Sequence, residues 1–356
     1  MNQINSSLLR SSGPILVTGH TGFKGAWLLH LLRHLGIPAI GYSLPPEPDC
    51  LYQRSKLQGQ VPEHFGDIRN YAALEKFINL HQPAGVIHLA AQALVIDSYT
   101  NPRETFEVNV IGTTNVLSAA FSCESVKGIV VATTDKVYRN NNSGRSFIET
   151  DPLEGKDPYS ASKVGTEAAV SAWQQIKKIS GGPSLISARA GNVIGGGDWG
   201  LNRLLPDLVR GFMSGSEILI RNPESTRPWQ HVLDPVTGYV MALGKLLEGE
   251  ELSSINFGPS GSNLSVAQVA ELASREWPSS SSQITYGQNS VSDTKEAVHL
   301  NLNAELANKL LGWNPVWDQE SSVVDTVKWW KSIAQDKCNI LKAIELDLEK
   351  QKLTQS

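Results

Sequence analysis

Short apolar runs rich in β-branched residues alternate with longer amphipathic stretches along the first half of the chain. Runs of the first kind are typical of buried strands, and apolar positions spaced three or four apart are typical of helices. We expect strands at Ile15–Val17, Pro38–Tyr42, Gly85–Leu89, Gly128–Thr133 and Ser184–Arg189, and helices at Trp27–Leu35, Asn109–Phe121 and Ser160–Ile176. This alternation predicts the α/β fold class, with a parallel sheet between two layers of helices.

Two segments rich in Gly, Asn, Ser, Asp and Pro are predicted to be loops, Asn140–Asp157 and Asn192–Asn202. The pattern predicts a smaller C-terminal α/β lobe over residues 194–356, with residues 230–250 returning to the first domain. The expected helices are Arg203–Ser214, Asp234–Leu247, Ser265–Trp277, Ala304–Leu311 and Val323–Ile333, and the expected strands are Glu217–Arg221 and Ser253–Phe257. Ser265 is expected to cap its helix.

A glycine-rich turn follows the first predicted strand and opens the first predicted helix. Its glycines are Gly19, Gly22 and Gly25, with two residues between neighbouring glycines. Such a turn lets backbone amides approach a pyrophosphate at the positive end of the following helix. Residues 1–193 are therefore expected to form a dinucleotide-binding domain, a Rossmann-type doubly wound parallel sheet. An ordinary glycine-containing strand–helix turn is the alternative.

Composition and charge narrow the class of protein. The chain has 356 residues, of which 40% are apolar, enough for a large α/β unit with a second lobe. A net charge of −4 differs from the basic charge that is typical of nucleic-acid-binding domains. The three scattered cysteines form no disulfide framework or zinc pattern, and no apolar run is long enough for a membrane span. We therefore expect a cytoplasmic protein with no metal, no membrane contact and no nucleic-acid partner.

Tyr159 and Lys163 lie four residues apart in a predicted helix, so they share one face. A cation beside a phenol favours the phenolate and lowers the phenol's pKa, which makes tyrosine a usable base near neutral pH. A nicotinamide dehydrogenase needs such a base to take a hydroxyl proton as hydride leaves the carbon. The preceding Asp157-Pro158 predicts a loop-to-helix junction that projects Tyr159 near a strand end. A surface Tyr–Lys pair is the alternative.

Thr134, Asp135 and Lys136 follow the strand predicted at Gly128–Thr133, so they lie at a carboxyl strand end, where sites collect. They place a hydroxyl, a carboxylic acid and an amine side by side. These groups suit hydrogen bonding to a substrate hydroxyl and acid and base steps. A lysine acts as a base only when neutral, which requires surroundings that lower its pKa. A turn with a solvated lysine is the alternative.

The residues after the second predicted strand bear on the cofactor. Ser43 stands there, and the segment lacks both the acidic residue that holds a ribose hydroxyl and an arginine for an extra phosphate. The Ser43 hydroxyl is expected to bond the ribose. The carboxylate of Asp67 is expected to accept from an adenine amine, with a helix cap as the alternative.

These motifs resemble those of the extended short-chain dehydrogenase/reductase family, which includes nucleotide-sugar epimerases and 4,6-dehydratases. The resemblance covers nearly the whole chain and is closest to the glucose 4,6-dehydratases that use CDP-glucose. The segments that carry it are Thr18–Gly25, His88–Gln92, Thr134–Lys136, Asp157–Lys163, Arg189–Trp199, Arg227–Val232 and Leu311–Trp313. The pair Asp135-Lys136 separates this group from relatives acting on dTDP-glucose or GDP-mannose, which tend to carry Asp-Glu or Ser-Glu there.

The resemblance implies conversion of CDP-glucose to CDP-4-keto-6-deoxyglucose and water, by internal hydride transfer through bound NAD. It implies that Tyr159, helped by Lys163, takes the proton of the C4 hydroxyl. Lys136 then removes the C5 proton and Asp135 protonates the departing C6 hydroxyl. Thr134 is expected to hydrogen-bond a substrate hydroxyl.

The resemblance also implies two sets of binding residues. The expected cofactor-binding residues are Gly19, Thr21, Gly22, Phe23, Lys24, Gly25, Ser43, Asp67, Ile68, Ala90, Tyr159 and Lys163. The expected substrate-binding residues are Gln92, Thr134, Asn192, Arg203 and Arg227. The guanidinium of Arg227 is expected to make a bidentate contact with phosphate oxygens of a nucleotide diphosphate held by the smaller lobe. A surface salt bridge is the alternative. Trp229 is expected to be core.

Two departures from the family pattern lie near the expected sugar pocket. An arginine is expected near 94–97, where Ile96 and Asp97 stand, and the segment 139–145 lacks the expected aromatic and acidic residues. A 4-epimerase or a dehydratase for another nucleotide sugar therefore stays an alternative. A non-catalytic dinucleotide sensor is a second alternative, although a sensor needs neither Tyr159 nor Lys163.

Members of this family often pair through a four-helix bundle made from two helices of each subunit. The corresponding segments here are Pro102–Phe121 and Ser160–Ile176. The second carries an apolar stripe of mainly small side chains at Val164, Ala168, Ala169, Ala172 and Ile176. Small side chains permit close helix approach, so a homodimer is expected. Packing of the stripe on its own sheet is the alternative.

Overall fold

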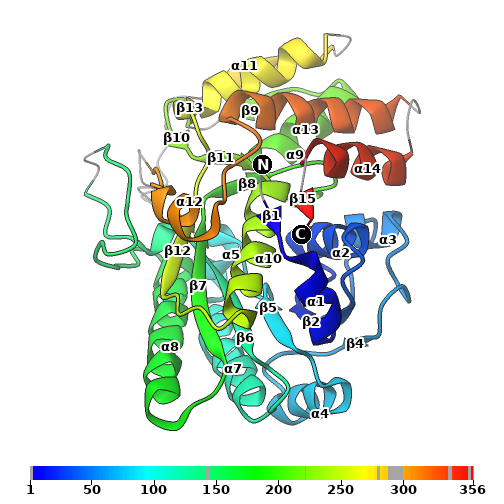
Figure 1. The fold of residues 1–356 in the computed structure, drawn as a ribbon. Coiled ribbons are helices and arrows are strands. Elements are labelled where there is room, and N and C mark those ends of the chain that lie inside the picture. The colour runs from blue at the N-terminus through cyan, green and yellow to red at the C-terminus, as the bar shows by residue number, and fades with distance from the viewer. Residues whose placement is uncertain are drawn as a thin grey trace.

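A seven-stranded parallel sheet forms the centre of the molecule (Figure 1). The computed structural model describes residues 3–141, 144–220, 222–278, 281–287, 300–335, 339–351 and 354–355. In spatial order the strands are β12 (Ser254–Phe257), β7 (Ser184–Ala190), β6 (Gly128–Thr134), β5 (Gly85–His88), β2 (Ile15–Thr18), β3 (Ala39–Ser43) and β4 (Glu63–Phe65). Every neighbouring pair in this sheet is parallel. The predicted α/β doubly wound fold is confirmed.

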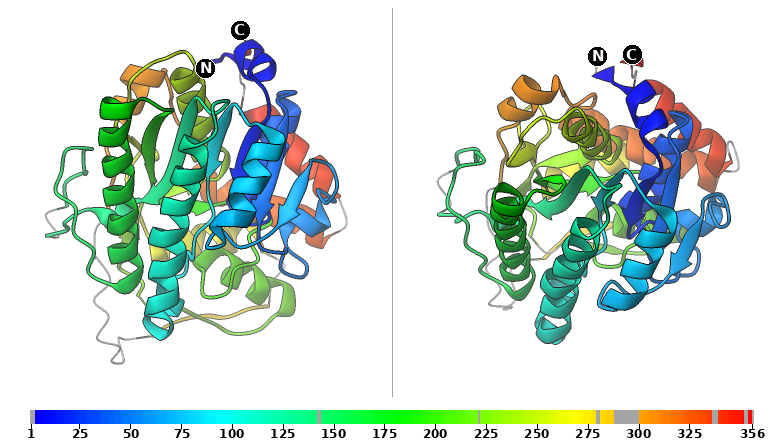
Figure 2. Two further views of the ribbon diagram at one scale, coloured as in Figure 1. Left: turned by 90° about the horizontal axis from the view of Figure 1, so that it is seen from below. Right: turned by 60° about the horizontal axis from the view of Figure 1, so that its bottom comes forward.

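Helices cover both faces of the sheet. On one face α4 (Tyr71–His81), α7 (Thr113–Phe121) and α8 (Pro158–Ser180) lie side by side, and α2 (Phe23–His34) and α10 (Leu233–Leu247) pack on the other (Figure 2). Both faces of the central strands are therefore buried. In β2, Ile15 and Val17 join the core under α2 and α10, whereas Leu16 joins the core under α4 and α7. A strand buried on both faces is apolar at successive positions, as the sequence pattern predicts.

The remaining elements lie around the sheet. The small strands are β1 (Gln3–Ile4), β8 (Asn192–Ile194), β9 (Ile218–Ile220), β10 (Thr226–Arg227), β11 (Trp229–His231), β13 (Leu264–Ser265), β14 (Ile284–Tyr286) and β15 (Thr354–Gln355). The other α-helices are α1 (Ser6–Ser12), α3 (Leu51–Arg54), α5 (Val95–Thr100), α6 (Pro102–Phe106), α9 (Leu204–Ser214), α11 (Val266–Glu276), α12 (Glu305–Leu311), α13 (Gln319–Ala334) and α14 (Ile340–Lys350). A π-helical segment, η1 (Glu107–Gly112), and a 3₁₀ turn, η2 (Asp135–Val137), complete the set.

Several segments differ from the sequence prediction. The helix expected at Asn109–Phe121 begins as the π-helical η1 and becomes α-helical only at Thr113. The strand expected at Glu217–Arg221 is β9, and Arg221 lies outside the described residues, as does Cys338. Helices α4 and α14 and the edge strand β4 are not among the expected elements, although Leu74, Phe77 and Ile78 have helical spacing in α4.

Two further expectations can be compared with the described residues. Ser265 caps α11 as predicted, because its side chain accepts from the Gln268 amide. Among the described residues, no helix combines the length and the apolar character needed to cross a bilayer.

Candidate active site

The strand order reverses between β2 and β5, and in open α/β sheets ligands bind at the carboxyl ends of the strands beside such a point. The glycine-rich turn lies there. Gly19 has a φ of +72°, and a Cβ on it would come within 2.6 Å of the Ala90 nitrogen. A Cβ on Gly25 would clash with the Gly19 carbonyl oxygen. These two glycines are therefore required by the close packing of the turn itself.

Gly22 differs from its two neighbours. A Cβ there would meet only the Gly19 carbonyl oxygen, at 3.3 Å, and its φ of −74° suits any residue. Gly22 is the N-cap of α2, and no side chain caps the first turn of that helix. The open space in front of a helix N-terminus fits the pyrophosphate of a dinucleotide.

Replacing Gly22 with leucine is expected to weaken NAD binding roughly 100-fold, or about 2.7 kcal/mol, because the side chain would fill the space in front of the helix N-terminus. Calorimetric titration with NAD measures this loss. The thermal unfolding midpoint should stay close to that of the unmodified protein, since Gly22 is not strained. Gly25→Ala is the matched comparison and should instead lower the unfolding midpoint. Unchanged NAD affinity in Gly22→Leu would contradict the assignment.

Thr21, Ser43 and Ala90 lie around the same strand ends. The Thr21 and Ser43 hydroxyls are 2.8 Å apart, and Thr21 also donates to the Leu44 carbonyl. The Ala90 amide donates to the Thr18 hydroxyl at 3.3 Å. Residues predicted to bind the cofactor therefore lie together at the carboxyl ends of β2, β3 and β5.

Asp67 and Ile68 follow β4 at the edge of the sheet. The Asp67 carboxylate accepts from the Arg69 guanidinium and amide, and this contact lowers the Asp67 pKa. The cap of α4 is Asn70, whose side chain accepts from the Ala73 amide, so the helix-cap alternative for Asp67 is wrong. Ile68 is buried.

The start of α8 fixes Tyr159 and Lys163. The Asp157 side chain accepts from the Ser160 amide at 2.9 Å, and Ser160 reciprocates in a capping box with Pro158 in the first turn. Both functional side chains are buried, and the Lys163 ammonium donates to the Ala132 carbonyl at 3.4 Å. The two residues lie beneath the end of β6, so the surface-pair alternative is wrong.

Burial shapes the pKa values of this pair. It raises the pKa of Tyr159 to about 12, against the lowering effect of a hydrogen bond with Thr134. It lowers the pKa of Lys163 to about 7; Lys24 lowers it further, and Glu167 opposes both effects. The sequence argument predicts a lowered phenol pKa, and the structure shows the opposite direction. The reason is that desolvation of the buried phenolate outweighs nearby positive charge.

Thr134, Asp135 and Lys136 lie at the end of β6, as predicted. The Thr134 hydroxyl donates to Asp135 Oδ1 at 3.0 Å, and Asp135 is fully buried. Asp135 Oδ2 is buried and has no hydrogen-bond partner among the described residues. The Lys136 ammonium lies 3.8 Å from Asp135 Oδ1 and donates to Asn192 Oδ1 at 3.4 Å. A carboxyl oxygen and an amine therefore face the same region as the Tyr159 phenol.

Lys24 and Tyr239 add two groups to this region. The Lys24 ammonium lies 5.8 Å from the centre of the Tyr239 ring. Burial lowers the Lys24 pKa to about 8; Arg203 lowers it as well, and Asp135 raises it. The Tyr239 hydroxyl is buried with no hydrogen-bond partner among the described residues, and burial raises the Tyr239 pKa, with a smaller contribution from Tyr159. Lys24 was predicted only as part of the glycine turn, and Tyr239 was not predicted, because it lies among apolar residues in the middle of α10.

The predicted substrate residues are distributed over both halves of the chain. One guanidinium nitrogen of Arg203 donates to both carboxylate oxygens of Asp198, at 2.9 and 3.1 Å. The side-chain nitrogen of Gln92 donates to the Leu94 carbonyl and to the Thr105 hydroxyl. This side chain therefore holds the loop after β5.

Arg227 and Trp229 are both buried in the C-terminal half. Arg227 is 6% exposed and donates to the Thr226 carbonyl, so it does not lie at the surface. Trp229 is 4% exposed and its indole donates to the Leu264 carbonyl, as expected for a core residue.

Other expectations concern the pocket wall and metals. Ile96 and Asp97 are exposed on α5, and Arg145 pairs with Asp151 at 2.7 Å.

Within the described part of the chain, no group of three or more His, Cys, Asp or Glu side chains is arranged to hold a metal ion.

Comparison with known proteins gives concordant results. The model of the NAD dependent epimerase/dehydratase family matches residues 15–258. A CDP-glucose 4,6-dehydratase of Salmonella typhimurium is 38% identical over 327 residues, covering 89% of this chain and 90% of that protein. A dTDP-glucose 4,6-dehydratase of Escherichia coli is 27% identical, covering 89% and 92% of the two chains.

A solved structure shares the fold. It is a dTDP-glucose 4,6-dehydratase from Streptomyces venezuelae with NAD bound, 22% identical, with a TM-score of 0.77 over 90% of this chain and 97% of that chain. The family match includes all seven strands of the central sheet, because the first of them in the chain, β2, begins at Ile15 and the last, β12, ends at Phe257. Because that match spans the whole sheet and the strongest of these similarities extends over most of the chain, the chain belongs to the NAD dependent epimerase/dehydratase family.

Proposed function

We propose that the protein is a NAD-dependent nucleotide-sugar 4,6-dehydratase that converts CDP-glucose to CDP-4-keto-6-deoxyglucose and water. The observation that carries the proposal is the placement of Asp135 and Lys136 beside Tyr159 at the end of β6. The same activity stands in the name of the relative that is 38% identical over most of both chains. A sensor has no use for this acid, amine and phenol in one buried region.

The proposed chemistry assigns one proton to each side chain. Bound NAD would supply the hydride chemistry, the transfer of a hydride from C4 of the sugar to C6. Tyr159 takes the C4 hydroxyl proton, and Lys163 in its charged form stabilises the phenolate. Lys136 removes the C5 proton, which the 4-keto group acidifies, and returns a proton to C5 when C6 is reduced. Asp135 supplies a proton to the departing C6 hydroxyl, from the carboxyl oxygen that has no partner in the protein.

The smaller lobe is proposed to hold the nucleotide diphosphate. Residues 194–356 contribute Arg203 and Arg227, and Asn192 lies just before them on β8. Arg203 acts electrostatically on both Lys24 and Tyr159, so it belongs to the same region as the catalytic groups. The dinucleotide is proposed to lie on residues 1–193, with 230–250 packing against that domain through α10.

A panel of nucleotide sugars tests the function. The protein is incubated with NAD and with CDP-glucose, dTDP-glucose, UDP-glucose or GDP-mannose, and the products are analysed by mass. The expected result is loss of one water from CDP-glucose and a 4-keto-6-deoxy product. An isomer of unchanged mass would indicate a 4-epimerase. Loss of water from another member of the panel instead would identify a different nucleotide sugar as the substrate.

A homodimer is part of the proposal. The exposed large apolar side chains on α5, α6, η1 and α8 include Ile96, Tyr99, Phe106, Ile111, Ile176 and Ile179. Ala168 and Ala172 of the small-residue stripe are also exposed, whereas Ala169 packs in the core under α8. An apolar surface of this kind is typical of a two-fold contact.

Light scattering at micromolar concentration should therefore give about twice the mass of one chain. Ile111→Glu should shift the protein to the monomer, because it places a charge on that surface. Leu80→Glu, at an exposed leucine of α4, is the matched control and should remain dimeric. A monomer mass for the unmodified protein contradicts the dimer.

The expected location is the cytoplasm. Cys50 and Cys123 are free thiols, and oxidising compartments favour disulfides in small secreted proteins. The proposed use of NAD and a nucleotide sugar points to the same compartment. Fractionation of cells that express the protein tests this assignment.

A further inference from the structure

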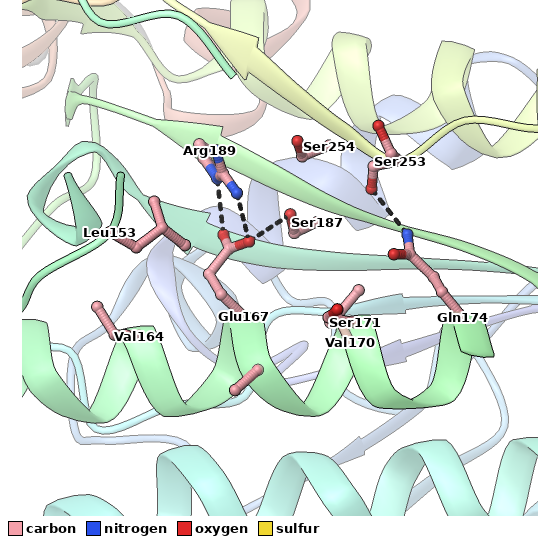
Figure 3. A pocket seen from close by; sticks show the side chains of 11 residues that line it. Leu153, Val164, Glu167, Val170, Ser171, Gln174, Ser187, Arg189, Ser253 and Ser254 are labelled. Carbon is pink, nitrogen blue, oxygen red and sulfur yellow. Dashed lines mark hydrogen bonds and ion pairs between the residues drawn. The ribbon is translucent and has the colours of Figure 1, made fainter. Parts of the chain in front are cut away.

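A buried ion pair lies beneath the end of β6. Glu167 of α8 and Arg189 of β7 are each about 5% exposed and meet at 2.7 Å. They form part of the wall of a pocket between α8, β7 and β12, with a volume of about 310 Å³ (Figure 3). The proposed chemistry uses neither residue, so a buried charge pair here requires a separate explanation.

The two oxygens of the Glu167 carboxylate accept four hydrogen bonds from donors on two strands, β6 and β7. Oε1 accepts from the Thr133 hydroxyl at 2.6 Å and from Arg189 Nε at 2.9 Å. Oε2 accepts from the Ser187 hydroxyl and from the Arg189 guanidinium, both at 2.7 Å. The carboxylate therefore joins α8 to β6 and β7 at one point, as Figure 3 shows for the Ser187 and Arg189 contacts.

Arg189 extends these contacts to the other side of the catalytic segment. Its guanidinium donates to the Tyr138 hydroxyl at 2.8 Å and to the Glu149 carbonyl at 3.0 Å. Thr133 immediately precedes Thr134, and Tyr138 immediately follows the η2 turn that carries Asp135 and Lys136. The ion pair thus holds both ends of the segment that bears the acid and the amine.

Glu167 also lies one helical turn after Lys163, on the same face of α8. We propose that the Glu167–Arg189 ion pair is a positioning device for the reaction: it fixes Thr134, Asp135 and Lys136 relative to Tyr159, and Glu167 keeps Lys163 in its charged form. This inference rests on the proposed function, because it assigns the pair to the service of those catalytic groups.

Three charged or titratable groups, from α2, α8 and β5, interact electrostatically with Lys163. Lys24 of α2 lowers the Lys163 pKa, and Glu167 raises it. His88 of β5 is buried and neutral, since burial lowers its pKa to about 3 and Lys163 lowers it further. Loss of the Glu167 charge would leave Lys163 facing the cation Lys24 without an opposing carboxylate. The ammonium form of Lys163 would then be lost at a lower pH.

The test compares Glu167→Gln with Glu167→Asp across a pH series. Glutamine has the same shape without the charge, and aspartate keeps the charge but is too short to reach all four donors. Glu248→Gln, in a surface pair with Lys245 at 2.8 Å, is the matched control. The pH dependence of kcat is measured per folded molecule, and amide hydrogen exchange is followed over 128–138 and 158–168 without substrate.

Glu167→Gln is expected to lose kcat by about tenfold to 100-fold, because small displacements of catalytic groups have effects of this size. The alkaline limb of its profile should move to lower pH. Glu167→Asp should lose kcat with the limb unmoved, and both variants should exchange faster in the two segments. Glu248→Gln should match the unmodified protein in every measurement.

Two results would overturn the inference. One is an unchanged kcat in Glu167→Gln, and the other is a lower kcat with an alkaline limb that does not move. If Glu167→Gln does not fold, Glu167→Asp decides, since a kcat equal to that of the unmodified protein would refute positioning. Failure of the proposed function is distinguishable, because in that case the unmodified protein itself forms no keto sugar.

Discussion

The double variant Asp135→Asn with Lys136→Met is expected to stop the reaction after oxidation at C4. Both groups lie beside Tyr159 but act, in the proposed chemistry, only on the elimination of water from C5 and C6. NADH should therefore appear in the enzyme, visible by its absorbance, while the 6-deoxy product forms about 100- to 10,000-fold more slowly. That range is the usual contribution of a positioned acid or base.

A variant with the same chemical changes elsewhere serves as the control. Lys342 and Glu345 form an exposed pair on α14 at 2.9 Å. Lys342→Met with Glu345→Gln should turn over at the rate of the unmodified protein. Normal turnover by the Asp135/Lys136 double variant would show that the division between oxidation and elimination is wrong.

Tyr159→Phe is expected to abolish both stages, because no other side chain is assigned to the C4 hydroxyl proton. Without that proton transfer neither NADH nor product should form, and kcat should fall at least about 1,000-fold. The variant should keep its fold, since the phenol's partner is the Thr134 hydroxyl at the edge of the site, not a group deep in the core. Single-turnover absorbance with CDP-glucose measures the first stage directly.

The matched control is Tyr71→Phe on α4, where the phenol donates to Glu75 on the helix surface. It removes the same oxygen far from the strand ends and should leave kcat unchanged. The two sets of variants then separate the stages: Tyr159→Phe should form no NADH, and the Asp135/Lys136 double variant should accumulate it. Formation of NADH at the normal rate by Tyr159→Phe would assign the first proton to another group.

The sequence predicted the elements whose signal is local. The apolar run before Gly19 can be satisfied only by a strand buried on both faces, and β2 is such a strand. Asp157-Pro158 predicted the start of α8, because an N-cap followed by proline favours a helix whatever lies around it. The glycines of the turn also followed from local chemistry, since Gly19 has a positive φ and Gly25 has no room for a Cβ.

Elements with a weak local signal were harder to predict. Strand β4 has three residues, none of them buried, so its sequence resembles a loop. Its strand character comes from hydrogen bonding to β3, a neighbour that the sequence pattern alone does not supply. The π-helical start of the helix expected at Asn109–Phe121 likewise has no pattern of its own in the sequence.

Contacts across the fold were decided by tertiary structure alone. Glu167 and Arg189 are 22 residues apart, and nothing in their local pattern pairs them; they meet because α8 crosses β7. The direction of the Tyr159 pKa shift is of the same kind. Local spacing places a lysine nearby, but the desolvation that raises the pKa depends on everything packed around the phenol. The sequence thus determined the strands, the turn and the set of chemical groups, whereas burial and pairing between distant segments, which depend on the whole fold, determined their charge states and their partners.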